Sequence, residues 1–388
     1  MTEGRAIVSQ RGAERIHNGH LWVYRSDVRS AEAERGDVVR VHDDRGRFLG
    51  RAFYSDRSQI TLRFLTREDV PVDRPFFSQR VRAAASFRQQ VVADTDSYRV
   101  VYGEADLLPS LIVDRYADYL VIQTLNQGVE RRKMEFVELL QDIFSPAGIA
   151  ERNDPRVRLL EGLDQTVSVL AGSIPEEVIT NINGVKFSLD LLRGQKTGDF
   201  LDQRENRRAA REYASGEVLD CFGYVGGFAL TVASQAQTVE SVDLAGAAIQ
   251  RGRSNQTLNS IANASFREGN AFDILKQCDE TGRRFHMVIL DPPAFAKNRD
   301  SVPAALRGYK EINLRALKIL NQGGYLITCS CSHHISESLF LQVVAEAALD
   351  AHRIVSILER RTQARDHPIL LMVPETCYIK CLILKVLS

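Results

Sequence analysis

One short segment in the C-terminal third of the chain holds side chains suited to chemistry on a flat ring. A predicted strand, Met287–Leu290, ends in Asp291-Pro292-Pro293-Ala294-Phe295. The two prolines stiffen this turn and remove backbone donors, which leaves carbonyl oxygens and the Asp291 carboxylate to address a polar heterocycle. Phe295 supplies a ring for stacking on that heterocycle. The segment therefore predicts a site for a nucleobase, with a simple turn as the alternative.

A second segment, Gly324–Ser332, carries two thiols and leads into His333-His334. Carbon-5 of cytosine is a poor nucleophile, so its methylation requires a thiolate that first adds at carbon-6. Cys331 is our predicted nucleophile and Cys329 its neighbour. Residues two apart on a strand face the same side, so spacing alone does not choose between them. A small apolar core residue is the alternative role for either cysteine.

A glycine-containing turn upstream predicts a ligand-binding loop. Within Val218–Gly227, Asp220 ends a strand, and Gly223 and Gly226 lie in the turn that opens the next helix. Glycines let the backbone approach a ligand closely, and the amides of the helix point at it. The spacing G-x-x-G-G differs from the G-x-G-x-x-G of dehydrogenases, which disfavours NAD.

An acidic residue, Asp243, ends the next predicted strand, Val239–Val242. A carboxylate at this place can accept hydrogen bonds from both hydroxyls of a ribose. The alternative is a cap for the helix predicted over Ala245–Asn259. Together with the glycine turn, Asp243 favours a nucleoside ligand.

These residues require a sheet that brings strand ends together. From Val185 onward apolar strands alternate with helices, which predicts parallel β-α-β units and a doubly wound α/β sheet whose ligands lie at the carboxyl ends of the strands. The predicted strands are Gly216–Asp220, Val239–Asp243, Ala264–Glu268, Phe285–Asp291 and Gly324–Thr328.

The first half of the chain has other patterns. Period-2 alternation within residues 1–70 predicts a small antiparallel barrel or sheet, and apolar residues one turn apart predict a helix over 76–93. Residues 97–180 follow as an α+β segment in strand-strand-helix-strand-strand order. Its predicted elements are Leu111–Val113, Tyr119–Thr124, Glu130–Phe144, Val157–Leu160 and Thr166–Leu170.

Composition limits the function classes. Lys plus Arg and Asp plus Glu each number 50 in 388 residues, and this zero formal net charge argues against a basic tail but permits a local basic patch. The six cysteines lack C-x-x-C pairs, so neither disulfides nor a metal site is expected. There is no apolar block of signal-peptide or membrane-spanning length, so we expect a cytoplasmic protein without a membrane partner.

Blocks spaced along essentially the whole chain resemble those of bacterial 23S rRNA cytosine-C5 methyltransferases of the large-subunit RlmI type. The blocks are His20–Tyr24, Ser97–Arg99, Gly103–Asp106 with Leu108-Pro109, Lys196–Arg204, Cys221–Phe228, Asp291–Phe295, Arg307–Lys310, Ser330–Ser332 and Ala364–Pro368.

The resemblance implies three domains: an N-terminal β-rich PUA RNA-binding domain (1–72), a small α+β middle domain (73–184) and a C-terminal Rossmann-like class I methyltransferase domain (185–388). It implies S-adenosyl-L-methionine as cofactor and 23S rRNA as substrate. No metal is expected from the cysteine spacing, and a homodimer is one expected assembly. The family's serine-flanked cysteine falls on Cys331, so the resemblance assigns catalysis to Cys331 and Asp291. The implied cofactor-binding residues are Lys196, Thr197, Asp220, Phe222, Gly223, Gly226, Asp243, Asn270 and Asp291, and the implied substrate-binding residues are Arg204, Pro292, Pro293 and Phe295.

The sequence departs from its relatives at several positions. Asn270 stands where relatives have an acid that meets the adenine amino group, and an amide oxygen can still accept that bond. Asp220 stands where relatives often carry Asn, and Asp199 stands where the family has an aromatic residue. Ala294 stands where better-studied RNA cytosine methyltransferases carry a second cysteine that releases the product, so elimination here needs a different base.

Two other functions stay open at this point. One is methylation of an exocyclic amine such as guanine N2, which uses a similar Asp-Pro-Pro-x-Phe turn without a thiol. The other is a non-catalytic RNA-binding or assembly factor that has kept the fold. The intact Gly223, Gly226, Asp243 and Asp291 argue against the second of these.

Overall fold

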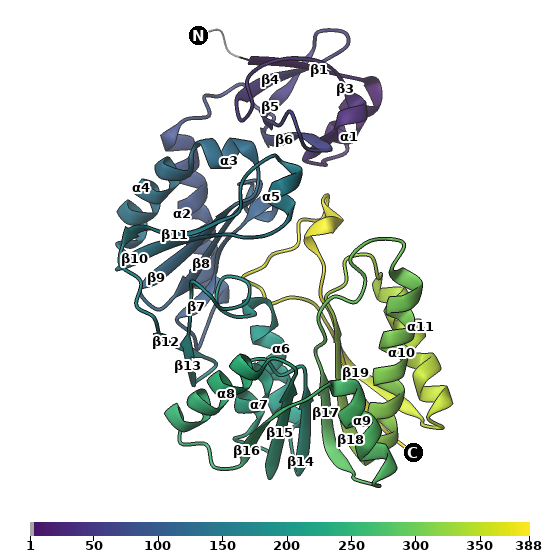
Figure 1. The fold of residues 1–388 in the computed structure, drawn as a ribbon. Coiled ribbons are helices and arrows are strands. Elements are labelled where there is room, and N and C mark those ends of the chain that lie inside the picture. Colours follow the sequence, from purple (N-terminus) through teal and green to yellow (C-terminus); the bar gives the residue numbers. More distant parts are fainter. Residues whose placement is uncertain (1–3) are drawn as a thin grey trace. The chain divides into compact units, whose positions relative to one another are not determined.

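The computed structural model describes residues 4–388, which form two compact units that are not continuous in the sequence (Figure 1). The first unit holds the chain up to Thr180 together with 189–201 and 365–376, and the second holds 181–188, 202–364 and 377–388. Two segments of the predicted C-terminal domain thus belong to the first unit. The three domains in chain order stay a prediction.

The N-terminal part of the first unit is a six-stranded sheet in the order β2-β6-β5-β4-β1-β3. The alternating segments of residues 1–70 form β4, β5 and β6, which pair antiparallel as expected. The sheet is not wholly antiparallel, because β1 pairs β4 in parallel, and β1, β2, β3 and helix α1 were not predicted. Alternate residues such as Val39 and Val41 are fully buried, as period 2 requires. The bounds are β1 Gly4–Val8, α1 Gln10–His17, β2 Trp22–Tyr24, β3 Val28–Glu32, β4 Val38–Asp43, β5 Phe48–Tyr54 and β6 Ile60–Thr66.

A five-stranded sheet, β11-β10-β9-β8-β7, follows in the same unit. The predicted helix over 76–93 is confirmed as α2, whose first turn is capped by the Asp73 carboxylate accepting from the Phe76 amide at 3.1 Å. The bounds are α2 Arg74–Val91, β7 Ser97–Tyr102, β8 Leu111–Tyr116, β9 Tyr119–Thr124, α3 Gln127–Arg131, α4 Lys133–Phe144, β10 Gly148–Asn153, α5 Val157–Leu160 and β11 Thr166–Gly172.

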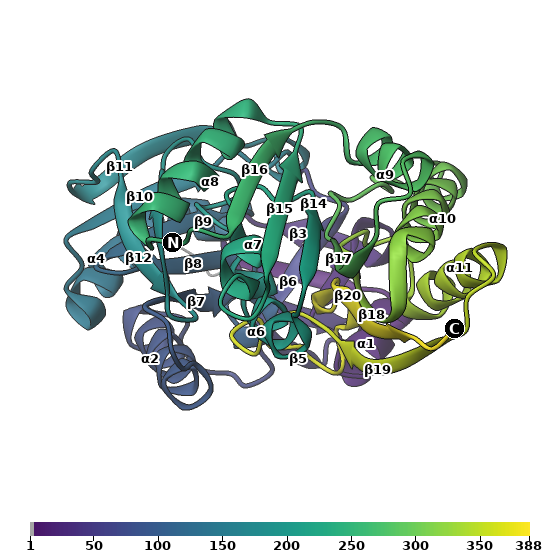
Figure 2. The same ribbon diagram turned by 90° about the horizontal axis from the view of Figure 1, so that it is seen from below.

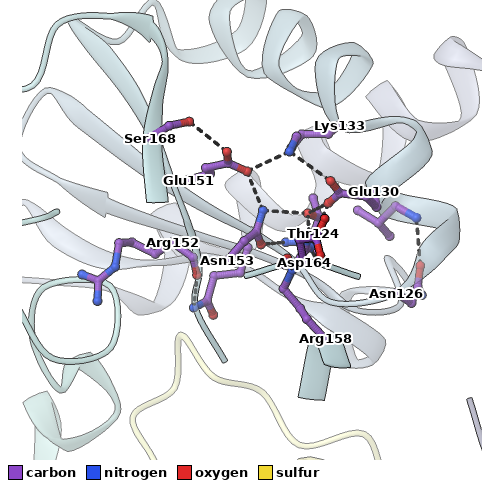
Figure 3. A network of polar contacts seen from close by, with 12 residues as sticks. Thr124, Asn126, Glu130, Lys133, Glu151, Arg152, Asn153, Arg158, Asp164 and Ser168 are labelled. Atoms are coloured by element: carbon purple, nitrogen blue, oxygen red, sulfur yellow. Dashed lines mark hydrogen bonds and ion pairs between the residues drawn. The ribbon is translucent and has the colours of Figure 1, made fainter. Parts of the chain in front are cut away.

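The strand predicted over Val157–Leu160 is wrong, because this segment is the one-turn helix α5. Its Leu159 and Leu160 are exposed, whereas the buried side chain is that of Arg158. Two strands of the sheet, β7 and β10, were not predicted, and the polar residues of β10 are held in a hydrogen-bonded network (Figure 3). In that network Lys133 Nζ bonds both Glu130 (3.0 Å) and Glu151 (2.8 Å).

The second unit contains a seven-stranded sheet in the order β16-β15-β14-β17-β18-β20-β19, in which the first five strands are parallel and β20 is antiparallel to both neighbours. Helices α6, α7 and α8 cover one face, and α9, α10 and α11 cover the other (Figure 2). The predicted doubly wound sheet is confirmed. The strands are β14 Glu217–Cys221, β15 Thr238–Asp243, β16 Ala264–Glu268, β17 Phe285–Leu290, β18 Leu320–Ser330, β19 Val355–Arg361 and β20 Lys380–Val386.

The helices of this unit complete the layers and bury apolar faces against the sheet. Tyr309, Ile312 and Ala316 of α10 are fully buried in the same cluster as Phe340 of α11. The helices are α6 Arg204–Tyr213, α7 Gly227–Val232, α8 Gly246–Leu258, α9 Ala271–Glu280, α10 Val302–Ile319 and α11 Glu337–Asp350, and a hairpin of β12 Val178–Ile182 and β13 Val185–Leu189 precedes them.

No helix within residues 4–388 is both long and apolar enough to cross a membrane. Within the same residues, no group of three or more His, Cys, Asp or Glu side chains is arranged to hold a metal ion.

Candidate active site

Four predicted site residues meet at one edge of the seven-stranded sheet. Asp220, Asp243 and Asp291 lie at or directly after the carboxyl ends of β14, β15 and β17, and Cys331 directly follows β18. These strands are parallel neighbours, so their carboxyl ends share an edge. Open α/β sheets bind their ligands at this edge.

The turn after β14 has a strained backbone and no room for a side chain at its centre. Phe222 (φ 66°) and Tyr224 (φ 49°) are both in the left-handed region, which L-residues with side chains rarely adopt. A Cβ on Gly223 would lie 1.9 Å from Ser241 Oγ and 2.8 Å from Asp220 Oδ2. Gly223 is therefore required by close approach, and the strain around it is typical of a ligand-binding loop.

Asp220 is fully buried beneath this turn. Its Oδ2 accepts hydrogen bonds from Ser241 Oγ (3.0 Å) and from the Ala229 amide (3.2 Å). Its Oδ1 is buried and has no hydrogen-bond partner among the described residues. Burial raises the pKa of Asp220 to about 7, the bond from Ser241 acts in the opposite direction, and the charge of Asp291 adds to the rise. A buried acceptor without a partner indicates a place for a donor from a ligand.

Asp243 accepts backbone amides on both carboxylate oxygens. The donors are Tyr224 N and Ala245 N, each at 2.9 Å. The residue at the cap position of α8 is Ala245, so Asp243 is not the helix cap that the sequence left open. Each oxygen retains acceptor capacity for a further donor.

Asn270 is exposed and caps α9, because its Oδ1 accepts from the Phe272 amide at 3.0 Å. The sequence predicted an adenine contact for this oxygen and did not predict the cap.

Two predicted cofactor residues, Lys196 and Thr197, lie in the first unit and not in the unit of the other site residues. Thr197 is buried, and its hydroxyl donates to Asp114 Oδ2 at 2.6 Å and lies 3.0 Å from the Tyr116 hydroxyl. Lys196 is exposed, and its Nζ lies 4.3 Å from the centre of the Phe200 ring.

Asp291 has a partner that sequence reasoning missed. The Gln203 side-chain amide donates to Asp291 Oδ1 at 2.7 Å, and Gln203 Oε1 in turn accepts from Asn206 Nδ2 at 2.7 Å. Gln203 lies in the Lys196–Arg204 block that carries the family resemblance, and this was the one sequence feature that could have indicated it as a site residue. Arg204 begins α6 and is buried, and its carbonyl accepts from Asn183 Nδ2 at 2.7 Å.

The two candidate thiols have different surroundings. Cys331 is partly exposed, and its Sγ lies 3.8 Å from the carbonyl oxygen of Pro292, in the Asp-Pro-Pro turn. Cys329 is fully buried opposite Cys381 of β20. The contact with Cys381 and, next to it, burial raise the pKa of Cys329 well above that of an ordinary thiol. Strand β18 ends at Ser330, so Cys329 lies within the strand and Cys331 lies outside it. The two thiols therefore do not face the same side of the sheet, as they would if the strand continued.

Tyr309 of α10 fixes the segment around Cys331. Its hydroxyl accepts from Ser330 Oγ at 3.0 Å and lies 2.9 Å from Ser332 Oγ, and Ser332 Oγ accepts from the Ala296 amide at 3.1 Å. This buried cluster joins the serine-flanked cysteine to the Asp-Pro-Pro turn. Sequence reasoning missed Tyr309, although it lies in the Arg307–Lys310 block.

Aromatic rings line the same edge. Phe295, the predicted stacking residue, packs on Tyr309 with ring centres 4.7 Å apart. Phe222 lies 6.5 Å from both Phe272 and Phe295, and these two are 6.0 Å apart. Of the prolines, Pro292 is buried and Pro293 exposed. A partly buried aromatic cluster thus connects the glycine turn with the Asp-Pro-Pro turn, and sequence reasoning missed Phe272.

Known proteins share the sequence features and the fold described above. Residues 156–372 match the family model of S-adenosylmethionine-dependent methyltransferases, and residues 6–67 match that of PUA-like domains. A solved methyltransferase complexed with SAH has the same fold, with a TM-score of 0.86 at 22% identity over 98% of this chain and 100% of that chain. A methyltransferase structure from Streptococcus mutans gives 0.83 at 21% identity, over 98% and 100% of the chains.

Curated relatives extend the match to nearly the full length. The chain is 40% identical to the ribosomal RNA large subunit methyltransferase I of Tolumonas auensis, over 94% of this chain and 95% of the relative. It is 39% identical to the protein of the same name from Vibrio cholerae, over 98% and 99%. The chain belongs to the ribosomal RNA large subunit methyltransferase I family, S-adenosylmethionine-dependent methyltransferases with a PUA-like domain.

Proposed function

We propose that this protein methylates carbon-5 of a cytosine in the 23S rRNA of the large ribosomal subunit, through a covalent bond between Cys331 and carbon-6. The names of the relatives support an rRNA of the large subunit as the substrate. The observation that carries the proposed chemistry is the position of the Cys331 thiol. It is partly exposed directly after β18, with its sulfur 3.8 Å from the Pro292 carbonyl oxygen.

The residues at the sheet edge fit S-adenosylmethionine. Gly223 leaves a space that a Cβ would fill, and Asp220 Oδ1 is a buried acceptor without a partner among residues 4–388. Both oxygens of Asp243 keep acceptor capacity that ribose hydroxyls can use, and the Phe222 and Phe272 rings can supply flat faces for the adenine. We propose that these residues hold the cofactor, with Gly226 shaping the turn and Asn270 close to the adenine. The cofactor roles of Lys196 and Thr197 stay predictions. When bound, S-adenosylmethionine supplies an electrophilic methyl group.

The protein's own residues activate the cytosine. Because carbon-6 cannot be reached in a stacked helix, we expect the target base to leave its stack, with Phe295 and the Pro292-Pro293 turn receiving it. Arg204 is buried, so its predicted contact to the substrate is not part of this mechanism. The Cys331 thiolate adds to carbon-6, which moves electron density to carbon-5 and makes it nucleophilic. Asp291, oriented by Gln203, holds the N3 and amino edge of the ring and favours protonation of the adduct at N3.

Release of the product completes the reaction. A base removes the proton from carbon-5, and the carbon-6 to sulfur bond then breaks to return the thiolate. Ala294 cannot serve as this base, so we expect a water molecule or another side chain of the edge to take the proton. The PUA-like domain, whose basic side chains are all arginines, is the proposed contact to folded RNA. A cytoplasmic location and a homodimer remain predictions.

Nucleoside mass spectrometry of 23S rRNA tests the proposal. The samples come from a strain lacking this protein and from the same strain complemented with wild type or Cys331→Ala. Loss of one 5-methylcytosine, restored only by the wild type, is the expected result. An unchanged 5-methylcytosine level with a missing methylguanine would contradict it and favour amine methylation. Unchanged rRNA together with purified protein that does not bind S-adenosylmethionine would favour a non-catalytic assembly factor.

A further inference from the structure

A buried lysine near Cys331 has no role in the steps above. Lys380 is the first residue of β20 and pairs with Ser330 of β18, next to Cys331 in the chain. It is 8% exposed. Its Nζ donates to the carbonyl oxygens of Ser332 (2.7 Å) and Tyr378 (3.0 Å), which fixes the ammonium beneath the turn that carries Cys331.

No carboxylate forms an ion pair with Lys380 in the described part of the chain. Buried charges are normally paired, because removing an ion from water is costly. The titratable groups whose charge raises the pKa of Lys380 are, in order of their effect, the thiols of Cys331 and Cys377 and the carboxylate of Glu337 at the start of α11. Burial lowers the pKa of Lys380 to about 8, so the side chain still carries its charge in most molecules at neutral pH.

We propose that the Lys380 ammonium is the positioning residue that holds Cys331 as a thiolate. The proposal rests on the proposed role of Cys331 as nucleophile. Thiolates form where a nearby cation favours them, and a buried cation is screened by salt and water less than an exposed one. His333 and His334 are both exposed, which makes them weaker sources of this effect. Lys380 acts through the sulfur and does not touch the RNA.

The pH dependence of Cys331 alkylation tests this relationship in the full chain. Iodoacetamide modification is followed by mass spectrometry of the Cys331 peptide from acid to alkaline pH. In the wild type we expect a midpoint below the ordinary thiol value of about 8.5. Lys380→Met should raise that midpoint by about one unit, which means roughly tenfold slower alkylation near neutral pH. Lys385→Met, on the same strand beside Tyr325, is the matched control and should leave the midpoint unchanged.

Two further measurements keep the test decisive if Lys380→Met does not fold. Lys380→Arg retains the charge and should retain the low midpoint. The wild-type measurement is also decisive by itself. If the midpoint of the pH dependence of Cys331 alkylation is at or above that of free cysteine, the proposal is overturned. A folded Lys380→Met protein with an unchanged midpoint overturns it as well.

The alkylation assay does not depend on the methylation product. If Lys380→Met shifts the midpoint while Cys331→Ala still forms 5-methylcytosine, the proposed function fails and the charge relationship stands. If Cys331→Ala abolishes 5-methylcytosine and Lys380→Met shifts nothing, only the inference on Lys380 fails.

Discussion

The side-chain amide of Gln203 donates a hydrogen bond to Asp291 Oδ1 at 2.7 Å, and these two residues are 88 positions apart in the sequence. Gln203 is itself fixed, because its Oε1 accepts from Asn206 Nδ2 and Asn206 Nδ2 also donates to the carbonyl of Thr362 at 3.0 Å. An amide held at both ends can orient a carboxylate without changing its charge. Asp291 is thus presented in one orientation to whatever binds at the sheet edge.

Replacing Gln203 with Glu should therefore lower turnover strongly. The change removes the donor and brings two carboxylates within hydrogen-bond distance, so one of them must take up a proton. A lost hydrogen bond to a charged group is worth about 1.5–3 kcal/mol, which corresponds to roughly a 10- to 100-fold lower kcat. Steady-state methylation of an rRNA fragment measures the effect, with Gln235→Glu on the exposed surface as control. A Gln203→Glu protein that turns over like the wild type would show that the orientation of Asp291 by Gln203 is not needed for catalysis.

Removing the Tyr309 hydroxyl should destabilise the protein and disturb the Cys331 segment together. In Tyr309→Phe, Ser330 and Ser332 lose their shared buried partner. Both serine oxygens still accept from backbone amides, so the loss is that of the hydrogen bonds to the Tyr309 hydroxyl. Losing these buried bonds costs about 1–3 kcal/mol, which we expect in the free energy of unfolding measured by denaturant. We also expect kcat to fall more than KM changes, since the thiol is displaced and the RNA contacts are not. Equal stability of variant and wild type would mean that water replaces the hydroxyl.

Gly223→Ala should abolish cofactor binding through a steric clash. The new Cβ would meet Ser241 Oγ at 1.9 Å and Asp220 Oδ2 at 2.8 Å, distances that force the turn to move. Adding Ser241→Ala removes the nearer obstacle, so the double variant should recover part of the affinity, and calorimetry with S-adenosylmethionine measures both. Ser241→Ala alone is the control for the lost hydrogen bond to Asp220. A Gly223→Ala protein with wild-type affinity would show that the glycine is not needed for close approach.

Asp243→Ala should weaken S-adenosylmethionine binding by roughly 10- to 100-fold, the equivalent of about 1.4–2.8 kcal/mol for a lost charged acceptor. Asp243→Asn retains one acceptor oxygen, so its affinity for S-adenosylmethionine should lie between that of Asp243→Ala and that of the wild type. Both oxygens also hold backbone amides, so a thermal melt is needed to separate lost affinity from a loosened turn. Glu280→Ala, an exposed carboxylate on α9, is the matched control. Unchanged affinity in a folded Asp243→Ala protein would exclude the ribose contact.

The sequence predicted those site residues whose position follows from their own strand. Asp220, Asp243 and Asp291 each close an apolar strand, and parallel strands necessarily bring such residues to one edge. The doubly wound sheet was predictable for the same reason, since apolar strands alternate with helices along the chain.

What could not be predicted depends on contacts between distant segments. In β10, Glu151 and Asn153 look like loop residues, yet they are buried because Lys133 and Thr124 bond them from elsewhere in the chain (Figure 3). Gln203, Tyr309 and Lys380 gain their roles in the same way. The difference between Cys329 and Cys331 depends on where β18 ends, and spacing does not reveal strand ends to one residue.

The buried Asp220 should make the stability of the cofactor-free protein depend on pH. Its pKa is raised from 3.8 to about 7 in the folded protein, so between these values the folded state binds more protons than the unfolded state. The free energy of unfolding should therefore fall as the pH rises through this window, by up to about 4 kcal/mol, because a shift of one unit is worth about 1.4 kcal/mol. Asp220→Asn removes this titration while leaving an amide oxygen for Ser241 and Ala229. The free energy of unfolding of both proteins is measured with denaturant at a series of pH values. Subtracting the values of Asp220→Asn from those of the wild type cancels the contribution of the other titrating groups. Parallel curves for the two proteins would mean that Asp220 is charged at an ordinary pKa, and that its Oδ1 has water as a partner.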